Sequence, residues 1–278
     1  MTASPKDPAY VPGYSDDERQ RLVEQAQLFY VHTRRLLCDA GIGPGMRVLD
    51  VGCGVGDVSM LAASLVGTEG AVVGVDADPR SLALARQRVE DRRLRNVGFA
   101  EGDLRAFSFD EPFDAVVGRF ILMYLADPVE AVHHVATLVR PGGVVVFQEY
   151  QLTFECLSRP DVVPLWDQWM AWVLGALDKA GVEMQMGLKL YEVFTTADLP
   201  PPCVEIDMHF LTPADPLGPK VAAHTVRSVL PFIERYGLAT AEEAGVETFA
   251  ERLHADLVAR GAVVSWPPIM SARTRMEP

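Results

Sequence analysis

The sequence lacks any long hydrophobic run, so we expect no membrane-spanning helix. A membrane span needs about 18 or more consecutive apolar residues, and the longest apolar stretches, such as 143–147, fall far short of that. The first fifteen residues are polar and rich in proline, without the apolar segment of a signal peptide. The sequence therefore predicts a cytoplasmic protein with no membrane partner.

Cysteine and positive charge are also scarce. The four cysteines (Cys38, Cys53, Cys156 and Cys203) lie far apart with no C-x-x-C pair, which disfavours a zinc site and a disulfide framework. The chain has 25 Lys and Arg against 38 Asp and Glu, a net charge of −13. Proteins that bind nucleic acid by neutralising phosphates need the opposite excess, so we expect no nucleic-acid partner.

Apolar residues, in contrast, are plentiful enough for a sizeable core. They make up 49% of the 278 residues, and charged residues make up 23%, which is close to the average for globular proteins. The length suggests two nominal domains, although one α/β domain with insertions also fills it. No linker rich in Gly or Ser divides the chain, so we expect one domain over 1–278.

Strands and helices alternate in the first half of the chain. Five short apolar runs predict buried strands, at residues 47–52, 71–76, 97–101, 113–118 and 144–149. Three stretches between them have helical periodicity, at residues 60–66, 79–90 and 127–139. Alternation of this kind implies right-handed βαβ crossovers and a parallel sheet covered on both faces. The fold class is therefore a doubly wound, Rossmann-like α/β fold.

The segments on either side of this core are mainly helical. A Ser15-Asp-Asp-Glu18 capping box begins an amphipathic helix that ends near Gly41. The second half contains further helical and strand candidates: helices at 166–180, 190–197 and 220–260, and strands at 204–211 and 262–266. We interpret these helices as insertions on one sheet.

A glycine-rich turn follows the first predicted strand and leads into a helix. It reads Asp50-Val-Gly-Cys-Gly-Val-Gly-Asp57, and such turns bind ligands in doubly wound folds. Its G-x-G-x-G spacing differs from the G-x-G-x-x-G of a dinucleotide site, and Asp50 would face a pyrophosphate unfavourably. The ligand is therefore expected to carry a cation there.

Two more acidic residues follow the next strands. Asp76 ends the second strand, 24 residues after Gly52, where a carboxylate can accept both hydroxyls of a ribose. Gly102 and Asp103 follow the third strand, where a carboxylate can accept from the exocyclic amine of adenine. These positions together describe an adenosine with a zwitterionic tail and no phosphate, which fits S-adenosylmethionine.

Five segments in this order and spacing carry a family resemblance, namely Val48–Gly56, Gly74–Pro79, Ala100–Asp103, Phe113–Val117 and Leu138–Gly143. The chain resembles the class I S-adenosylmethionine-dependent methyltransferases, in particular the bacterial small-molecule branch similar to ubiquinone and menaquinone methyltransferases. The resemblance covers residues 20–150 well and the rest in outline. It implies a mostly parallel, seven-stranded sheet with helical insertions that form a lid. It divides the domain into an N-terminal cover helix (1–42), a cofactor-binding half (43–150) and an acceptor-side half (151–278).

The resemblance also implies which residues hold S-adenosylmethionine. Gly52, Cys53 and Gly54 are expected to line the methionine moiety. Asp76 and Ala77 are expected at the ribose, and Gly102, Asp103 and Leu104 at the adenine. Arg119 is expected to flank the sulfonium. Independently of the resemblance, Tyr14 lies in a segment flanked by Pro and Gly ahead of the capped helix, and we expect it to order onto bound cofactor. Asp50 either contacts the cofactor or holds the glycine turn.

The sequence also restricts the chemical class of the methyl acceptor. Residues 118–124 read Gly-Arg-Phe-Ile-Leu-Met-Tyr instead of the Pro-Pro-aromatic motif of DNA amino-methyltransferases, and the lone Pro-Cys pair lies far downstream at 202–203. No acidic cluster accompanies Arg119, so we expect no metal. A small molecule is the expected acceptor, methylated on oxygen because a carboxylate and histidines are available as bases.

The residues expected on the acceptor side fall into two groups. The catalytic candidates are Glu149, Arg119, His209 and His224. The substrate-binding candidates are Tyr124, Tyr150, Trp166 and Trp169. C- or N-methylation by the same fold stays open, as do a non-methylating cyclase or sensor and a homodimer, whereas the glycine spacing disfavours a nicotinamide-dependent oxidoreductase.

Overall fold

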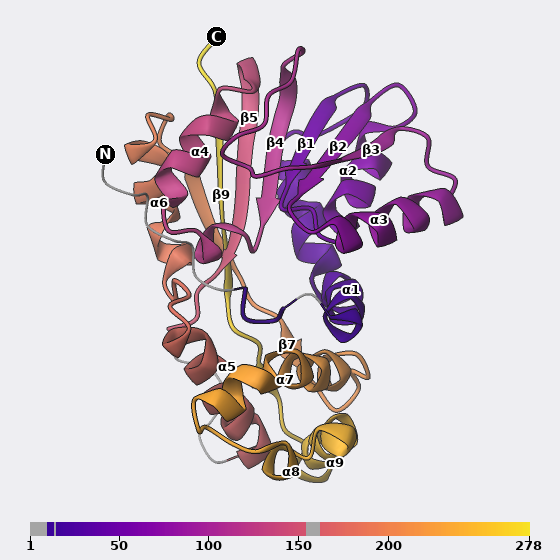
Figure 1. Cartoon of the computed structure of the whole chain (residues 1–278), viewed down its shortest axis with the longest axis vertical. Helices are drawn as coiled ribbons and strands as arrows, with labels where there is room; N and C mark the ends of the chain where they lie inside the picture. Colours follow the sequence, from indigo (N-terminus) through magenta and orange to yellow (C-terminus); the bar gives the residue numbers. More distant parts are fainter. Residues whose placement is uncertain (1–9, 14, 154–161) are drawn as a thin grey trace.

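A seven-stranded sheet organises the structure, a computed structural model that describes residues 10–13, 15–153 and 162–278 (Figure 1). The strand order is β3-β2-β1-β4-β5-β9-β6. The strands are β1 (Arg47–Val51), β2 (Ala71–Asp76), β3 (Val97–Glu101), β4 (Phe113–Arg119), β5 (Val139–Tyr150), β6 (Cys203–Asp207) and β9 (Ile269–Arg275). The first five strands are parallel, as predicted, and only β9 runs antiparallel to its neighbours. The doubly wound, mostly parallel fold class is thereby confirmed.

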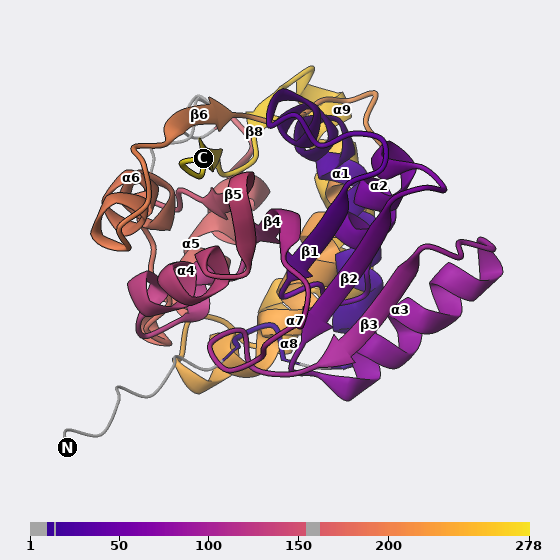
Figure 2. The same cartoon turned by 90° about the horizontal axis from the view of Figure 1, so that it is seen from above.

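Helices cover both faces of this sheet, which explains why its strands are apolar runs and not alternating ones. Figure 2 shows α2 (Asp57–Val66) and α3 (Pro79–Asp91) on one side, and α4 (Pro128–Ala136) and α6 (Met186–Thr196) on the other. Val48 and Val72 pack with α2 in one buried cluster, whereas Leu49 and Val116 belong to the cluster on the opposite face. Both faces of each central strand are therefore buried.

The strands of the second half differ from the prediction. The expected strand at 204–211 is divided into β6 and the short β7 (Phe210–Leu211), which pairs with β8 (Val264–Ser265) in a separate two-stranded sheet. The seventh strand of the main sheet is β9, which the sequence pattern does not predict. Two of its buried residues, Ser271 and Thr274, are polar, so the strand lacks the apolar run that marks the others.

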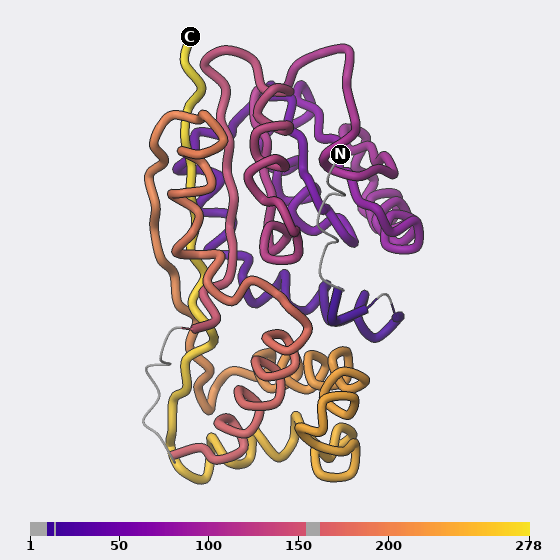
Figure 3. The backbone as a smooth tube through the Cα atoms, turned by 60° about the vertical axis from the view of Figure 1, so that its left-hand side comes forward, coloured from indigo at the N-terminus to yellow at the C-terminus, as the bar shows by residue number. Residues whose placement is uncertain are grey.

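A helical lobe lies beyond the carboxyl ends of the strands (Figures 1 and 3). It consists of α5 (Pro164–Lys179), α7 (Gly218–Arg235), α8 (Ala241–Ala244), η2 (Val246–Thr248) and α9 (Phe249–Arg260). The predicted helix at 220–260 is broken into these shorter pieces. Gly237 and Gly245 lie at the breaks with φ of 63° and 56°, a left-handed conformation that ends helices.

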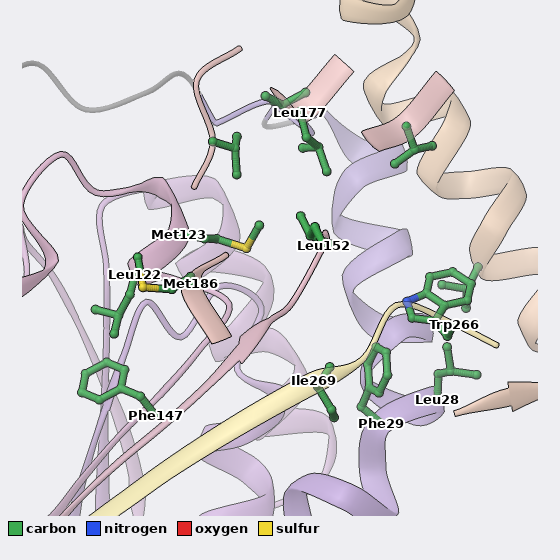
Figure 4. Close-up of a cluster of buried hydrophobic side chains, with 14 of the residues drawn as sticks. Leu28, Phe29, Leu122, Met123, Phe147, Leu152, Leu177, Met186, Trp266 and Ile269 are labelled. Atoms are coloured by element: carbon green, nitrogen blue, oxygen red, sulfur yellow. The ribbon is translucent and has the colours of Figure 1, made fainter. Parts of the chain in front are cut away.

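A continuous apolar core joins the lobe to the sheet. Figure 4 shows this cluster, in which Phe147 of β5 and Leu122 of η1 (Leu122–Tyr124) belong to the sheet side. Leu177 and Trp266 belong to the lobe side of the same cluster. Within the described residues, no helix is both long and apolar enough to cross a membrane.

The first helix, α1 (Asp16–Asp39), packs between the sheet and the lobe and contacts both α2 and α7. The Ser15 hydroxyl accepts the Glu18 N–H at 3.1 Å, as the capping box predicts. The Glu18 carboxylate does not return to the Ser15 backbone. It accepts instead from the Tyr10 hydroxyl and the Arg21 guanidinium, so only half of the predicted capping box forms.

Candidate active site

A cavity of about 340 Å³ opens at the carboxyl ends of the central strands, beneath the helical lobe. Its wall contains the turn after β1, the ends of β2, β4 and β5, and side chains of α1, α5 and α7. This edge of a doubly wound sheet is where such folds bind ligands. The cavity has two ends, one at the glycine-rich turn and one between α1 and the lobe.

The glycine-rich turn forms one end of the cavity. Gly52, Gly54 and Gly56 have φ of 66°, 51° and 83°, a region that side chains other than glycine rarely adopt. A Cβ on Gly52 would lie 2.8 Å from Cδ1 of Ile121. Gly52, Cys53 and Gly54 all line the cavity, so the cavity surface here is largely backbone. The amino terminus of α2 follows this turn directly in the sequence.

Asp50 lies beneath this turn. It is buried, and the Ser59 hydroxyl of α2 donates to its carboxylate at 2.5 Å. Burial raises the pKa of Asp50 to about 7, against the opposing effects of the Ser59 hydrogen bond and the Arg119 charge. Asp50 therefore ties β1 to α2. Because it also lines the cavity, contact with a ligand stays a prediction for it.

Asp76 lies beside the turn at the end of β2. Its two carboxylate oxygens accept the N–H groups of Gly54 and Asp78, each at 2.8 Å. These bonds lower its pKa, but burial has the larger effect and the pKa is raised overall. Asp76 and Ala77 both line the cavity. The carboxylate is thus held rigidly, with lone pairs left to accept from hydroxyl groups.

The loop after β3 forms the far edge of the same end. Gly102, Asp103 and Leu104 line the cavity. The side chain of Asp103 is 48% exposed and pairs with Arg105 at 2.7 Å. The Arg105 guanidinium holds the pKa of Asp103 below its usual value, so this carboxylate is an ionised acceptor at neutral pH.

Arg119 and Phe120 follow β4 at the middle of the cavity. The Arg119 guanidinium donates to the Thr33 hydroxyl at 3.1 Å, and burial lowers its pKa. Phe120 has φ of 56° and stacks on Tyr150 with ring centroids 4.1 Å apart. The two side chains bring a cation and an aromatic face to the junction of the two ends.

Glu149 does not lie where the sequence interpretation put it. The side chain is 0% exposed and is absent from the cavity wall. Its Oε1 accepts the backbone N–H groups of Ile121 and Leu122 at 2.9 and 2.8 Å, and burial raises its pKa to about 7. The carboxylate therefore holds the start of η1 from behind, and it is Tyr150, the next residue, that lines the cavity.

Neither predicted catalytic histidine lines the cavity. His209 lies 3.4 Å from the Asp215 carboxylate, and burial lowers its pKa. His224 lies 2.7 Å from the Glu24 carboxylate. The structure thus brings neither histidine to the residues at the glycine turn, and both interact with carboxylates elsewhere.

Aromatic side chains surround the other end of the cavity. Tyr124, Tyr150 and Trp169 line it, as predicted for the acceptor side. Trp166 lies behind Trp169, stacked with ring centroids 4.6 Å apart, and does not reach the cavity. The Tyr150 hydroxyl accepts from Gln25 at 2.8 Å and from Trp266 at 3.2 Å, and Trp266 is a wall residue that the sequence does not reveal.

The sequence also fails to reveal three polar residues of the cavity wall. Tyr10, Glu18 and Arg21 line the cavity, and the spacing of Glu18 and Arg21 on α1 would equally suit an ordinary surface pair. Tyr14, predicted to order onto bound cofactor, lies outside the described residues. In the ranges 10–13, 15–153 and 162–278, no group of three or more His, Cys, Asp or Glu could hold a metal ion.

Comparison with known sequences agrees with this geometry. Residues 42–193 match a family model described as a methyltransferase domain. Aklanonic acid methyltransferase DauC of Streptomyces sp. (strain C5) is 36% identical over 115 residues, 41% of this chain and 52% of that protein. Demethylmenaquinone methyltransferase of Staphylococcus aureus (strain MRSA252) is 32% identical over 120 residues, 43% of this chain and 49% of that protein. The match spans about half the length of these relatives.

Solved structures share the fold at low sequence identity. The YcgJ protein of Bacillus subtilis gives a TM-score of 0.56 at 16% identity, covering 89% of this chain and 99% of that one. Phosphoethanolamine N-methyltransferase 2 of Haemonchus contortus, solved with S-adenosyl-L-methionine, gives 0.56 at 19% identity, covering 95% of this chain and 58% of that one. The fold shared with these structures therefore covers more of the chain than the residues matched by the family model.

Proposed function

Because the chain belongs to the methyltransferase-domain family, we propose that it transfers a methyl group from S-adenosylmethionine to an oxygen atom of a small, largely apolar acceptor. The acceptor class is that of secondary metabolites and quinone-like compounds. The observation that carries the proposal is one continuous cavity, with a glycine-turn end suited to the cofactor and an aromatic end suited to the acceptor.

The glycine-turn end fits an adenosine with an amino-acid tail. The backbone of Gly52 and Gly54 allows close approach of the tail, and the fixed carboxylate of Asp76 can accept both ribose hydroxyls. Asp103 and Leu104 line the same end, where we expect the adenine to bind. Four carboxylates (Asp50, Asp57, Asp76 and Asp103) line the cavity in this region, which suits a ligand that carries a sulfonium cation and lacks phosphate.

The aromatic end fits a planar, apolar acceptor. Phe120 and Tyr150 stack face to face, and Trp169 and Trp266 lie at 5.0 Å between ring centroids. Such walls bind apolar rings through area and stacking. The names of two relatives, for aklanonic acid and for demethylmenaquinone, support a quinone-like or other small-molecule acceptor.

Methyl transfer is an in-line displacement, for which S-adenosylmethionine supplies the activated methyl group. The chain's own residues then have to align two molecules and exclude water. Ile121 packs against Gly52, and Glu149 holds the segment that presents Ile121. We therefore assign Glu149 a positioning role, and assign His209 and His224 no role in the transfer.

Incubation with S-adenosylmethionine and a library of phenols, acids and polyketide-like compounds tests this function. We expect a product heavier by one methyl group, with formation of S-adenosylhomocysteine in equal amount. Fragmentation of the product by mass spectrometry locates the methyl group on oxygen, carbon or nitrogen. Calorimetry that shows no binding of S-adenosylhomocysteine would refute the proposal regardless of the library.

A further inference from the structure

The Tyr150 hydroxyl is held by two groups that can only donate to it. The amide nitrogen of Gln25 donates at 2.8 Å and the indole N–H of Trp266 donates at 3.2 Å. Neither nitrogen can accept a hydrogen bond in return. The three side chains come from the end of β5, from α1 and from the segment between β8 and β9, and all three line the cavity.

These two bonds leave the hydroxyl free to donate its own proton. A phenolic hydroxyl has one proton and two lone pairs, and the lone pairs are engaged by Gln25 and Trp266. In the described part of the chain, no residue accepts the Tyr150 proton. Once a ligand displaces water from this wall, a donor without a partner costs free energy. An acceptor atom of the ligand itself is therefore the expected partner.

Ring contacts fix the direction of this donor. Phe120 stacks on the Tyr150 ring with centroids 4.1 Å apart and planes 7° apart. Phe29 meets the same ring edge-on, with centroids 5.9 Å apart. The proton of a phenol lies in the plane of its ring because the oxygen is conjugated with the ring. A fixed ring therefore fixes the plane in which the bond to a ligand forms.

The donor lies on the acceptor's side of the cavity. The ring of Trp266, which holds the hydroxyl, packs 5.0 Å from the ring of Trp169 on α5. Both tryptophans line the cavity beneath the helical lobe. A ligand atom that meets the Tyr150 hydroxyl therefore belongs to the molecule bound between α1 and the lobe.

Tyr150 keeps its proton at neutral pH. Burial raises its pKa to about 12, although the hydrogen bonds from Trp266 and Gln25 lower it. A group that stays protonated in this way is a poor general base. The hydroxyl thus acts in one direction only, as a donor.

We propose that Tyr150 determines acceptor specificity: its hydroxyl only donates, and it selects molecules that place a lone pair, such as that of a ring carbonyl, against it. This role rests on the methyl transfer proposed above and specifies the polarity of one atom of the acceptor. A molecule with a C–H or N–H group at that position would leave the donor unpaired. Sites built around a hydrogen bond reject such analogues.

The test compares 1-indanone with 1-methyleneindane, in which a CH₂ group replaces the carbonyl oxygen at nearly equal shape. Each probe is titrated calorimetrically into the protein saturated with S-adenosylhomocysteine. We expect the ketone to bind about fivefold more tightly, which corresponds to one net hydrogen bond. In Tyr150→Phe the two probes should bind equally, and the affinity for S-adenosylhomocysteine should stay within about twofold of wild type.

A second variant keeps the tyrosine and redirects its proton. Gln25→Glu places a carboxylate at the hydroxyl, where it accepts the Tyr150 proton, so the preference for the ketone should be lost. Gln27→Glu is the same change at an exposed position of α1 and should retain the preference. Infrared spectra add a readout that a purely structural role would not move. The carbonyl stretch of bound, ¹³C-labelled 1-indanone should lie at lower frequency in the wild type than in Tyr150→Phe.

Near-ultraviolet circular dichroism reports the folding of each variant, and Gln25→Glu decides the question if Tyr150→Phe does not fold. Equal binding of the two probes to the wild type would overturn the inference, as would failure of the ketone to bind or a preference that survives in the folded variants. A loss of S-adenosylhomocysteine affinity of about tenfold or more in Tyr150→Phe would assign the hydroxyl to the cofactor and would also overturn it. Failure of the wild type to bind S-adenosylhomocysteine would instead refute the proposed function, so the two failures are distinguishable.

Discussion

The two ends of the cavity are built in different ways. The glycine-turn end consists of strand-to-helix turns within residues 50–105, and its surface is largely backbone together with Asp76. The acceptor end consists of side chains from segments far apart in sequence, such as Gln25, Tyr150 and Trp266. The first end is a local property of the chain, and the second exists only through tertiary packing.

This difference matches the extent of the sequence likeness. The family model covers residues 42–193, which include the whole glycine-turn end. Glu18, Arg21 and Trp266 lie outside that range, although all three line the cavity. A backbone-built site tolerates change in its surroundings, whereas a site built from side chains can change with each substitution.

The largest expected effect is a loss of cofactor affinity when the glycine-turn end of the cavity is altered. Asp76→Ala removes the carboxylate that holds Gly54 and that we assign to two ribose hydroxyls. Hydrogen bonds to charged groups are worth about 1.5 to 3 kcal/mol each, so calorimetry should show a loss of S-adenosylhomocysteine affinity of about 10²-fold or more. Asp91→Ala, at an exposed residue of α3, is the control. Unchanged S-adenosylhomocysteine affinity in Asp76→Ala would refute the assignment of the glycine-turn end to the cofactor.

A smaller effect, on the KM for the methyl acceptor, is expected when the two stacked tryptophans are substituted. Trp169→Phe changes the cavity wall, whereas Trp166→Phe changes only what lies behind it. Both should lower the melting temperature because both residues are buried. Only Trp169→Phe should raise the KM for the methyl acceptor, by about fivefold for the loss of one aromatic contact. Equal KM changes in the two variants would contradict the placement of the wall.

The smallest expected effect on turnover belongs to Glu149→Gln. The amide oxygen can still accept from Ile121 and Leu122, so we expect turnover within about threefold of wild type. A fall of about 10²-fold with unchanged cofactor affinity would instead restore the base role that the sequence interpretation gave it.

The same variant tests the pKa of Glu149. Burial raises this pKa from about 4.5 to about 7, so the folded state binds the proton more tightly than the unfolded state does. The free energy of unfolding of the wild type therefore falls as the pH rises through this window. Glutamine does not titrate, so the melting temperature of Glu149→Gln relative to wild type should rise between pH 5 and pH 8. A difference independent of pH would contradict the buried, protonated carboxyl.

The central sheet could be predicted from the sequence because burial on both faces leaves an apolar run. The strands at 71–76 and 97–101 form with their predicted bounds. The position of Glu149 could not be predicted in the same way. The strand β5 continues to Tyr150, and successive side chains of a strand point to opposite faces. An error of one residue at the end of a strand therefore exchanges a cavity residue for a buried one.

The polar residues that α1 adds to the cavity wall could not be predicted because they carry no local signature. Glu18 fits a capping box by spacing, and only the positions of Tyr10 and Arg21 in three dimensions direct its carboxylate elsewhere. His209 and His224 have the chemistry of a base, but each interacts with a carboxylate away from the cavity. Residue type alone does not tell whether such a side chain reaches a cavity.

The place of β9 in the sheet has a consequence for biosynthesis. This strand lies between β5 and β6 and pairs with both, yet the ribosome makes it after either of them. Until it emerges, the nascent chain exposes the unpaired edge of β5, the kind of edge that promotes association with other chains. The turns of the glycine-turn end lie within residues 50–105. They are thus synthesised long before the strand that completes the sheet.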